Sequence, residues 1–335
     1  MFLGVGDNQY SMTFKIVYSD HIFGELDFER EMYEEIGGVV IDGEVEDAPL
    51  EELVRDADAM VVMYHPVNAA LMDLMPNCKI INRSGIGFDI VDLEAATERG
   101  IYVTNIPDYC IQEVADHAMS MIMALQRKIV FYNSRMKAGE WDINQGYTMH
   151  RIENQTLGLV ALGNIGIAVC KRAKCFGMNV IAFDPYLTDE QIMNGGAEPV
   201  HDLDELLMNS DVISVHTPLT PETRGMIGER EISLMKENAI VINVARGGIV
   251  DEDALIKALD KGRIRGAGLD VYTHEPVDLY GPLIQHERVI CTPHAAWNSI
   301  ESERERRRKS IEDVVRTLKG EIPKYLVNRK VLERD

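Results

Sequence analysis

Short apolar runs alternate with amphipathic, helix-like segments over the first hundred residues of the chain. Apolar runs bounded by turn residues are typical of buried strands, whereas apolar residues at helical spacing predict helices. The strands expected here are 14–18, 39–41, 59–64, 79–82 and 101–104, with helices at 28–36, 50–56 and 92–99. This alternation predicts an α/β lobe built on a parallel sheet.

The same alternation returns in the second half of the chain. Strands are expected at 157–160, 180–183, 211–216, 239–244, 268–272 and 289–291, and helices at 202–208, 229–235 and 251–261, besides one that ends at Gly177. The predicted fold class is therefore α/β, with two doubly wound lobes on parallel sheets.

Two longer helical patterns flank the second lobe. The first runs from Gln112 to Ala138 after Pro107 and is closed by Gly139. It exceeds the usual length of a globular helix, so we expect it to cross between lobes or to pack against another subunit. The second, from Glu301 to Lys319, contains the block Arg306-Arg307-Arg308-Lys309 among glutamates. We interpret that block as a solvated helix face rather than a nuclear signal.

A glycine-containing turn lies between the first strand and helix of the second lobe. It reads Leu162-Gly163-Asn164-Ile165-Gly166, and the next strand ends on Asp184. Backbone N–H groups and a helix N-terminus at such a turn suit a pyrophosphate. Asp184 suits the ribose hydroxyls and would repel a 2′-phosphate, which predicts NAD rather than NADP. Ala161 stands where the GxGxxG fingerprint has its first glycine, and we expect only a mild steric effect from the added methyl group.

Composition limits the classes of function. The chain has 335 residues, 46% hydrophobic and 27% charged, which suits a globular protein of two domains. A formal charge of −21 argues against nucleic acid or an anionic membrane as partner. No apolar run approaches the ~20 residues of a membrane span, and residues 1–12 lack the features of a signal peptide and are expected to be a loose leader. The five cysteines show no metal-ligand spacing, so we expect a cytoplasmic protein without a metal.

Three chemically active residues each follow a predicted strand of the second lobe. Arg246 can present its donors to a carboxylate and a carbonyl oxygen. His294 can exchange a proton with that oxygen, and Glu275 can fix the imidazole tautomer and favour its charged form. Taken alone, each residue suits a purely structural role: Arg246 as a charged residue in a turn, Glu275 as a surface acid and His294 as a capping residue. Together, at strand ends that share one edge of a sheet, they predict hydride transfer to a keto acid.

Longer segments resemble the D-isomer-specific 2-hydroxyacid dehydrogenases over nearly the whole chain. The segments include RSGIGFDIVDLEAATERGIYVTN, LGNIG, VHTPLTPET, NVARGGIVDEDAL, GLDVYTHEP and TPHAAW. Within the family, Met63-Tyr64-His65, Arg83, Asp184-Pro185-Tyr186-Leu187 and Trp297 are most similar to the branch of the C-terminal-binding proteins. The resemblance implies a flavodoxin-like substrate domain at 1–108 and 299–335. It implies a Rossmann NAD domain at 109–298, an active site in the cleft between them, and a homodimer built on the long helix.

The resemblance also implies roles for individual residues. Arg246, Glu275 and His294 would be catalytic. Gly163, Asn164, Ile165, Gly166, Asp184, Thr217, Pro218, Val244, Ala245 and Asp270 would bind the cofactor, with Asp270 on the nicotinamide carboxamide. The backbone of Gly85, Ile86 and Gly87, together with Arg83, Tyr64 and Trp297, would bind the substrate. His65 either lines the substrate mouth or caps a strand, and both interpretations stay open. His117 and His216 are expected to pack and to form hydrogen bonds.

These observations give two functional hypotheses. The first is an NAD-dependent oxidoreductase that transfers hydride between the cofactor and C2 of a small D-2-hydroxy or 2-keto acid. Glyoxylate, hydroxypyruvate, a phosphorylated acid and a sugar-derived acid all remain candidate substrates. The second is an NAD-sensing, peptide-binding corepressor, which the resemblance to the C-terminal-binding proteins implies.

Overall fold

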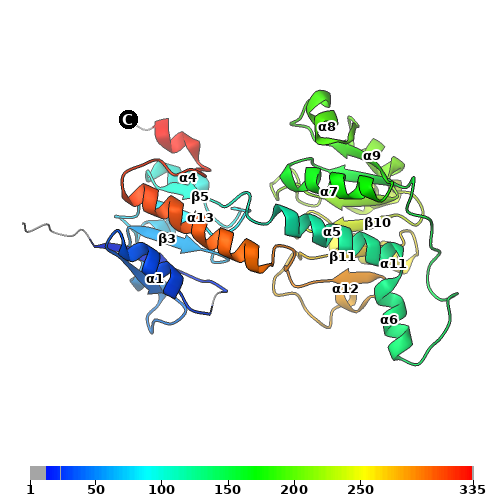
Figure 1. Ribbon diagram of the computed structural model, residues 1–335, viewed down its shortest axis with the longest axis horizontal. Helices are drawn as coiled ribbons and strands as arrows, with labels where there is room; N and C mark the ends of the chain where they lie inside the picture. Colours follow the sequence, from blue (N-terminus) through cyan, green and yellow to red (C-terminus); the bar gives the residue numbers. More distant parts are fainter. Residues whose placement is uncertain (1–12, 23, 334–335) are drawn as a thin grey trace, which may run out of the picture. The chain divides into compact units, whose positions relative to one another are not determined.

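The computed structural model describes residues 13–22 and 24–333 (Figure 1). The expected leader at residues 1–12 lies outside the described residues. The chain divides into two compact units. The first unit runs up to Tyr109 and takes in the residues from Ile300 onward, and the second unit is Cys110–Ser299.

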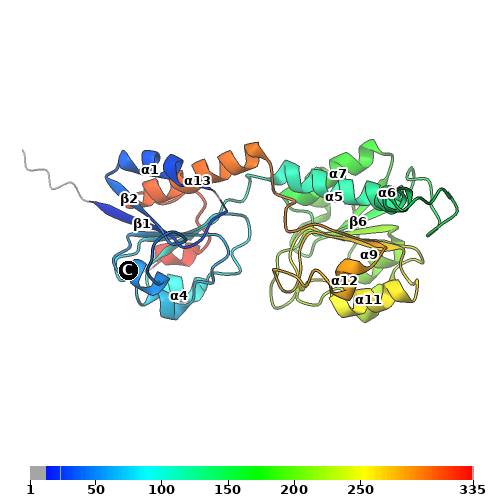
Figure 2. The ribbon, with the colours of Figure 1, turned by 90° about the horizontal axis from the view of Figure 1, so that it is seen from below.

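The first unit is a five-stranded parallel sheet with helices on both faces. Its strands are β1 Phe14–Tyr18, β2 Gly38–Asp42, β3 Ala59–Val62, β4 Ile80–Arg83 and β5 Tyr102–Thr104, in the order β2-β1-β3-β4-β5. Its helices are α1 Asp27–Glu34, α2 Leu50–Leu53, α3 Ala69–Met72, α4 Leu93–Glu98 and α13 Ile300–Leu318, followed by a 3₁₀ turn at Arg329–Glu333. Helices α1 and α13 cover one face and α4 the other (Figure 2). The strand order is that of flavodoxin-like sheets, as predicted for this lobe.

Helix α13 is buried far more deeply than its charged sequence predicts. Arg306 is fully buried, with its guanidinium 5.7 Å from the centre of the Tyr109 ring. Arg307 pairs with the buried carboxylate of Glu29, and the Lys309 ammonium lies 2.7 Å from Asp108. The expected solvated face is therefore wrong for these three residues, and only Arg308 of the block is exposed. Carboxylates brought by distant segments make the burial of Arg307 and Lys309 tolerable.

The second unit is a seven-stranded parallel sheet. Its strands are β6 Thr156–Val160, β7 Asn179–Phe183, β8 Glu198–Pro199, β9 Val212–Val215, β10 Ile240–Asn243, β11 Gly266–Leu269 and β12 Val289–Cys291. Their order is β12-β11-β10-β9-β6-β7-β8, so the chain reverses its direction of travel between β6 and β9. This is the order of a Rossmann sheet, and the reversal marks the point where doubly wound sheets bind their ligands.

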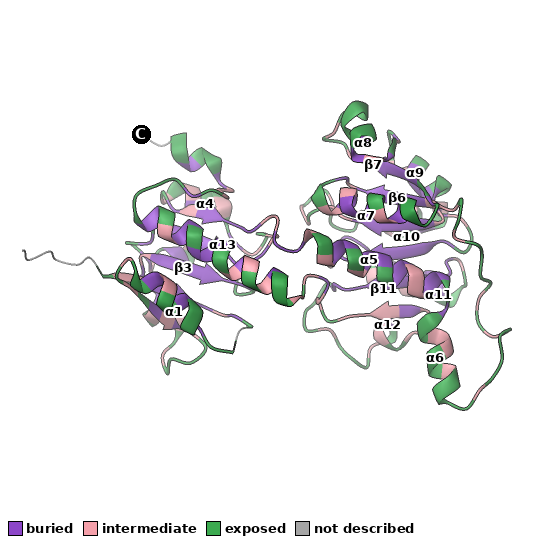
Figure 3. Cartoon of the chain, in the orientation of Figure 1, coloured by how far each residue is buried: buried purple, intermediate pink, exposed green. Residues whose placement is uncertain are grey.

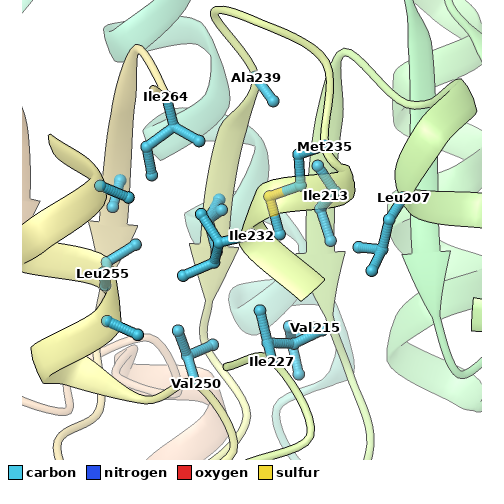
Figure 4. Close-up of a cluster of buried hydrophobic side chains, with 14 of the residues drawn as sticks. Leu207, Ile213, Val215, Ile227, Ile232, Met235, Ala239, Val250, Leu255 and Ile264 are labelled. Atoms are coloured by element: carbon cyan, nitrogen blue, oxygen red, sulfur yellow. The ribbon is translucent and has the colours of Figure 1, made fainter. Parts of the chain in front are cut away.

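Helices cover both faces of the second sheet as well (Figures 1 and 2). They are α5 Ile111–Gln126, α6 Ile129–Lys137, α7 Asn164–Cys175, α8 Asp189–Gly195, α9 Leu203–Asn209, α10 Glu229–Leu234, α11 Glu252–Asp260 and α12 Pro282–Gln285. Ile213 and Val215 of β9 belong to one buried apolar cluster with Ile232 of α10 and Leu255 of α11 (Figure 4). This core fixes the strands whose ends carry the candidate site.

The long helix after Pro107 is two helices. α5 ends at Gln126 and α6 begins at Ile129, because Lys128 adopts left-handed backbone with a φ of 53°. The Lys128 ammonium is buried, donates to the Gln145 carbonyl at 2.7 Å and lies over aromatic rings that include Tyr147. α5 packs against α7 and the sheet, whereas no residue of Ile129–Lys137 is buried (Figure 3). In the described part of the chain, no helix is long and apolar enough to cross a bilayer.

A few short elements differ from the prediction. α3, α8, β8 and α12 are not predicted by the apolar pattern, since each is short and partly exposed. The strand expected at 268–272 lies instead at Gly266–Leu269. Its two glycines are absent from an apolar pattern, and they allow close packing, because a Cβ on Gly266 would lie 2.7 Å from the Arg288 carbonyl oxygen.

Candidate active site

The predicted chemistry of the second unit gathers along one edge of its sheet. All paired strands are parallel, so their carboxyl ends point to the same edge. The glycine turn follows β6, Asp184 follows β7, Thr217 and Pro218 follow β9, Val244 to Arg246 follow β10, Asp270 follows β11, and His294 follows β12. Parallel sheets bind ligands at this edge.

The turn after β6 has the shape that a pyrophosphate requires. A Cβ on Gly163 would meet nothing within 4 Å, so the backbone there is open to a ligand. A Cβ on Gly166 would lie 2.8 Å from the carbonyl oxygen of Ala161, so this glycine lets α7 pack closely on the turn. α7 begins at Asn164 and directs its unpaired N–H groups at this opening. The residues therefore fit a dinucleotide.

Ala161 carries a cost that the sequence did not reveal. Its φ is 73°, in the left-handed region that favours glycine. For an L-residue this conformation costs roughly 1–2 kcal/mol. The expectation of a mild steric effect is therefore incomplete, because the cost lies in the backbone and not in the space that the methyl group takes.

Asp184, at the end of the neighbouring strand β7, accepts a hydrogen bond from the glycine turn after β6. Its Oδ2 accepts from the Leu162 N–H at 3.0 Å, and its Oδ1 accepts from the Tyr186 N–H at 3.0 Å. A carboxylate has about four acceptor sites, so both oxygens keep capacity for ribose hydroxyls. The side chain is only half-buried and stays accessible to a ligand.

His294 and Glu275 form a direct pair. Nδ1 of His294 lies 2.6 Å from Oε2 of Glu275, while Oε1 of Glu275 accepts from the Tyr272 N–H at 2.9 Å. Burial raises the pKa of Glu275, but the hydrogen bond and charge of His294 outweigh it and leave the pKa below its ordinary value. An ionised carboxylate accepts hydrogen bonds only, so Nδ1 of His294 carries the proton of this hydrogen bond.

Arg246 belongs to the same cluster. The buried Asn243 side chain clamps its turn, donating to the Arg246 carbonyl at 2.8 Å and accepting from the Ala245 N–H at 3.1 Å. A Cβ on Gly247 would fall 1.8 Å from the Tyr272 carbonyl oxygen, so only glycine lets this turn pack against the segment that leads to Glu275. The charge of Arg246 contributes to the lowered pKa of Glu275. The structure thus brings the three strand-end residues together.

Asp270 has a structural task at this edge besides its predicted one. It is fully buried, and its carboxylate accepts from the Ala295 and Ala296 N–H groups at 2.8 and 2.9 Å. Its oxygens therefore hold the turn that carries His294. The expected contact with the nicotinamide carboxamide stays a prediction.

The substrate candidates of the first unit lie at the ends of β3 and β4. Tyr64 and His65 follow β3 and are exposed, whereas Arg83 ends β4 and is buried. A Cβ on Gly85 would lie 1.6 Å from Nη1 of Arg83, so the guanidinium rests directly on the backbone of this turn. Half-buried Ile86 and Gly87 continue the turn, and Trp297, also half-buried, belongs to the second unit.

Sequence reasoning missed the residues that shape these turns. Besides Asn243, Asp20 after β1 accepts from the Met63 N–H at 3.1 Å and from the Tyr64 N–H at 2.5 Å. The signal available was the position of a short polar side chain at a strand end, where it often binds neighbouring backbone. The partners lie far along the chain, which only the fold reveals.

The sheet order, the glycine turn and the histidine–carboxylate pair define a nicotinamide-dependent oxidoreductase. Residues 119–296 match the family described as D-isomer specific 2-hydroxyacid dehydrogenase, NAD binding domain. The chain belongs to this family, and it is an NAD-dependent oxidoreductase of 2-hydroxy and 2-keto acids.

Particular relatives narrow the comparison. A D-3-phosphoglycerate dehydrogenase of Methanocaldococcus jannaschii is 40% identical over 88% of this chain, but the chain spans only 56% of that protein. A glyoxylate reductase of Korarchaeum cryptofilum is 39% identical over 84% of this chain and 86% of its own length. The structure of a D-lactate dehydrogenase from Aquifex aeolicus, complexed with NAD and lactic acid, matches with a TM-score of 0.82 and 31% identity over 91% of this chain and 96% of its own.

Proposed function

We propose that the protein reduces a small 2-keto acid with NADH, and that glyoxylate is the first substrate to test. The observation that carries the proposal is the 2.6 Å contact of His294 Nδ1 with Glu275 at the carboxyl edge of a Rossmann sheet. The similarity to a glyoxylate reductase over most of both chains supports the choice of substrate.

The mechanism follows from the three strand-end residues. Bound NADH supplies a hydride to C2 of the keto acid. Arg246 binds the carboxylate and the carbonyl oxygen and stabilises the negative charge that grows there. His294 gives a proton to that oxygen from Nε2, while Glu275 at Nδ1 stabilises the imidazolium. Reduction therefore requires charged His294, and oxidation requires its neutral form.

We assign the cofactor contacts to the edge residues of the second unit. Gly163, Asn164, Ile165 and Gly166 hold the pyrophosphate, and Asp184 binds the adenosine ribose. Thr217 and Pro218 line the adenosine side, Val244 and Ala245 the nicotinamide side, and Asp270 the carboxamide. The openness at Gly163 and the free acceptor capacity of Asp184 support this assignment.

We assign substrate binding to the first unit, with Trp297 as an additional contact. Backbone N–H groups at Gly85, Ile86 and Gly87 suit a carboxylate, and Arg83 adds positive charge in a chain of strongly negative net charge. Tyr64 and His65 follow the neighbouring strand, where Asp20 fixes the backbone.

A panel of 2-keto acids tests the proposal directly. We expect purified protein to oxidise NADH with glyoxylate, and to turn it over faster than hydroxypyruvate, a phosphorylated 2-keto acid or a sugar-derived acid. Because glycolate is achiral, the stereochemistry is read from hydroxypyruvate, which should give D-glycerate. Absence of turnover on every acid, or an L product, would overturn the proposal.

A corepressor-like module is the second candidate. It rests on the similarity of Met63-Tyr64-His65, Arg83 and Trp297 to the branch of the C-terminal-binding proteins, which stays a prediction. A peptide pull-down with and without NADH tests it. Turnover of a keto acid at enzymatic rates, without NADH-dependent peptide capture, would exclude this reading in favour of the enzyme.

We further infer a homodimer, with a contact surface that follows the second half of the predicted long helix. Apolar side chains are exposed on α6 and the segment after it, namely Ile129, Val130, Met136, Trp141 and Ile143. Trp141 is 86% exposed, and exposed apolar clusters mark association surfaces. Light scattering should give the mass of a dimer, and Trp141→Glu should shift it to a monomer. A wild-type monomer would contradict the inference.

A cytoplasmic location for the protein also stays a prediction.

A further inference from the structure

A chain of hydrogen bonds links helix α5 to the turn that carries His294. His117, in the first half of α5, places Nε2 2.9 Å from the Thr292 hydroxyl. That hydroxyl in turn donates to Oδ1 of the buried Asp270. The same carboxylate accepts from the backbone of Ala295 and Ala296. Nε2 of His117 also lies 3.7 Å from Oδ1 of Asp270 itself. His117 lies outside the set of residues assigned above.

The direction of these hydrogen bonds fixes the state of the imidazole. A threonine hydroxyl has one proton, and here it is donated to an acceptor-only carboxylate. Nε2 of His117 must therefore be the donor toward Thr292, which excludes the tautomer protonated only at Nδ1. The Thr292 hydroxyl, with its own proton committed to Asp270, accepts from the ring. The chain of donors runs from His117 through Thr292 to Asp270.

The turn after β12, where these hydrogen bonds end, contains an unfavourable backbone conformation. His294 has a φ of 52°, in left-handed backbone that a non-glycine residue adopts at a cost. Its N–H donates to the Asp270 carbonyl at 2.8 Å, and the two following alanines donate to the Asp270 carboxylate. Asp270 therefore holds the turn through both its backbone and its side chain. Rotation of that carboxylate would release the turn.

We propose that His117 is a positioning residue for His294 in the reaction proposed above. By donating to Thr292 it orients the hydroxyl that locks the Asp270 carboxylate, which holds the turn in its left-handed form. The proposal rests on the proposed function for its catalytic readout. Its structural part, the restraint of the turn, is measurable without turnover.

Paired variants of His117 separate donation from packing. His117→Gln retains an N–H donor at about the same reach, whereas His117→Leu retains bulk but cannot donate. We expect His117→Leu to lower kcat about 10-fold or more, because small misplacements of a catalytic group are costly. The Kd of NADH, measured by fluorescence, should stay within about 3-fold, since a 3-fold change is well under 1 kcal/mol. His117→Gln should restore most of the kcat.

Thr292 offers a second test of the same chain. Thr292→Ser keeps the hydroxyl and Thr292→Val removes it with little change in size. We expect Thr292→Val to lower kcat as His117→Leu does. The kcat of the double variant should be little lower than that of either single variant, since both substitutions interrupt the same series of hydrogen bonds. The matched control is Asp116→Asn, the neighbouring residue on α5, whose carboxylate pairs with Arg172 at the surface. It should leave kcat unchanged.

Amide hydrogen exchange tests the restraint of the turn without any substrate. In His117→Leu, the amides of residues 294–296 should exchange faster than in the wild type, while those of β11 and β12 stay protected. A loss of kcat that His117→Gln does not rescue, or unchanged exchange in the turn, would overturn the inference. Wild-type protein inactive on every keto acid, with faster exchange still seen in His117→Leu, would overturn the proposed function and leave the positioning inference standing.

Discussion

The turn after β6 and the turn after β12 each contain a non-glycine residue in left-handed backbone. Ala161 has a φ of 73° and His294 a φ of 52°. Both lie at the carboxyl edge of the same sheet, where ligands of doubly wound folds bind. They differ in what the side chain contributes, since an alanine methyl group adds nothing to the predicted chemistry, whereas the imidazole is its acid and base.

The two turns also differ in how they are held. The turn after β12 is restrained by Asp270 through its carbonyl and both carboxylate oxygens. In the turn after β6, the Ala161 N–H donates to the Phe183 carbonyl at 2.9 Å, and the Leu162 N–H donates to one carboxylate oxygen of Asp184 at 3.0 Å. Strained backbone persists where neighbouring structure over-determines it and often marks function. The comparison shows that strain alone does not identify a catalytic residue, because its restraints and its side chain must also be considered.

Replacing His294 tests the catalytic turn and should give the largest effect. Asparagine tolerates left-handed backbone better than alanine but has no proton to give at neutral pH. We expect kcat to fall about 10²–10⁴-fold in both His294→Asn and His294→Ala, with NADH affinity nearly unchanged. His294→Ala should also melt at a lower temperature than His294→Asn. Retained turnover in either variant would contradict the assigned role.

Glu275→Gln should have the next largest effect. Loss of a charge-assisted hydrogen bond worth about 1.5–3 kcal/mol predicts a fall in kcat of roughly 10- to 100-fold. Because the amide stabilises the charged imidazole less, the alkaline limb of the reduction rate should move to lower pH. A pH profile of kcat with glyoxylate measures this, and an unmoved limb would argue that Glu275 acts only through the backbone of Tyr272.

The stability difference between the wild type and Glu275→Gln should depend on pH. The pKa of folded Glu275 lies below its unfolded value, so its ionised form stabilises the fold above the unfolded pKa. That stabilisation is lost as the pH falls through the folded pKa. The Tm of the wild type should therefore exceed that of Glu275→Gln at neutral pH, and the difference should narrow on acidification. A difference that is constant with pH would contradict the linkage.

Asp184→Ala tests the cofactor turn. Without the carboxylate the ribose hydroxyls lose their acceptor, so we expect the Kd of NADH to rise about 10- to 100-fold, with kcat at saturating NADH little changed. Discrimination against NADPH should also weaken. Asp184→Asn, which keeps a carbonyl acceptor for the Leu162 N–H, separates support of the turn from ribose binding. A fall in kcat with unchanged affinity would argue against the assignment.

Ala161→Gly should give the smallest effect, and in the opposite direction. Glycine removes a left-handed strain of roughly 1–2 kcal/mol but adds roughly 0.5–1 kcal/mol of unfolded-state entropy. The free energy of unfolding in urea should therefore rise by about 0.5–1 kcal/mol, with kcat unchanged. A loss of stability would mean that neighbouring groups require the methyl group at this position.

Much of the second unit could be predicted from sequence because its signals are local. A buried parallel strand reads as an apolar run, and the glycine turn with Asp184 lies within one strand–helix–strand segment. The break at Lys128 was missed because the apolar face continues across it, and the cause is the burial of its ammonium against Gln145 and aromatic rings further along the chain. The burial of Arg306 was missed for a similar reason, since its neighbour Tyr109 lies far away in sequence.

The sequence by itself determined the α/β class and the family, and it singled out Arg246, Glu275 and His294 as candidate site residues, because these depend on local patterns and on motif spacing. The tertiary structure decided which groups hold those residues. Asp270 restrains the turn of His294, Gly247 admits the Tyr272 carbonyl, and His117 reaches Thr292 from another helix. Each of these is a hydrogen bond or a close approach between segments distant in the chain. Only the packed fold brings such partners within a few ångströms, so no local pattern records them.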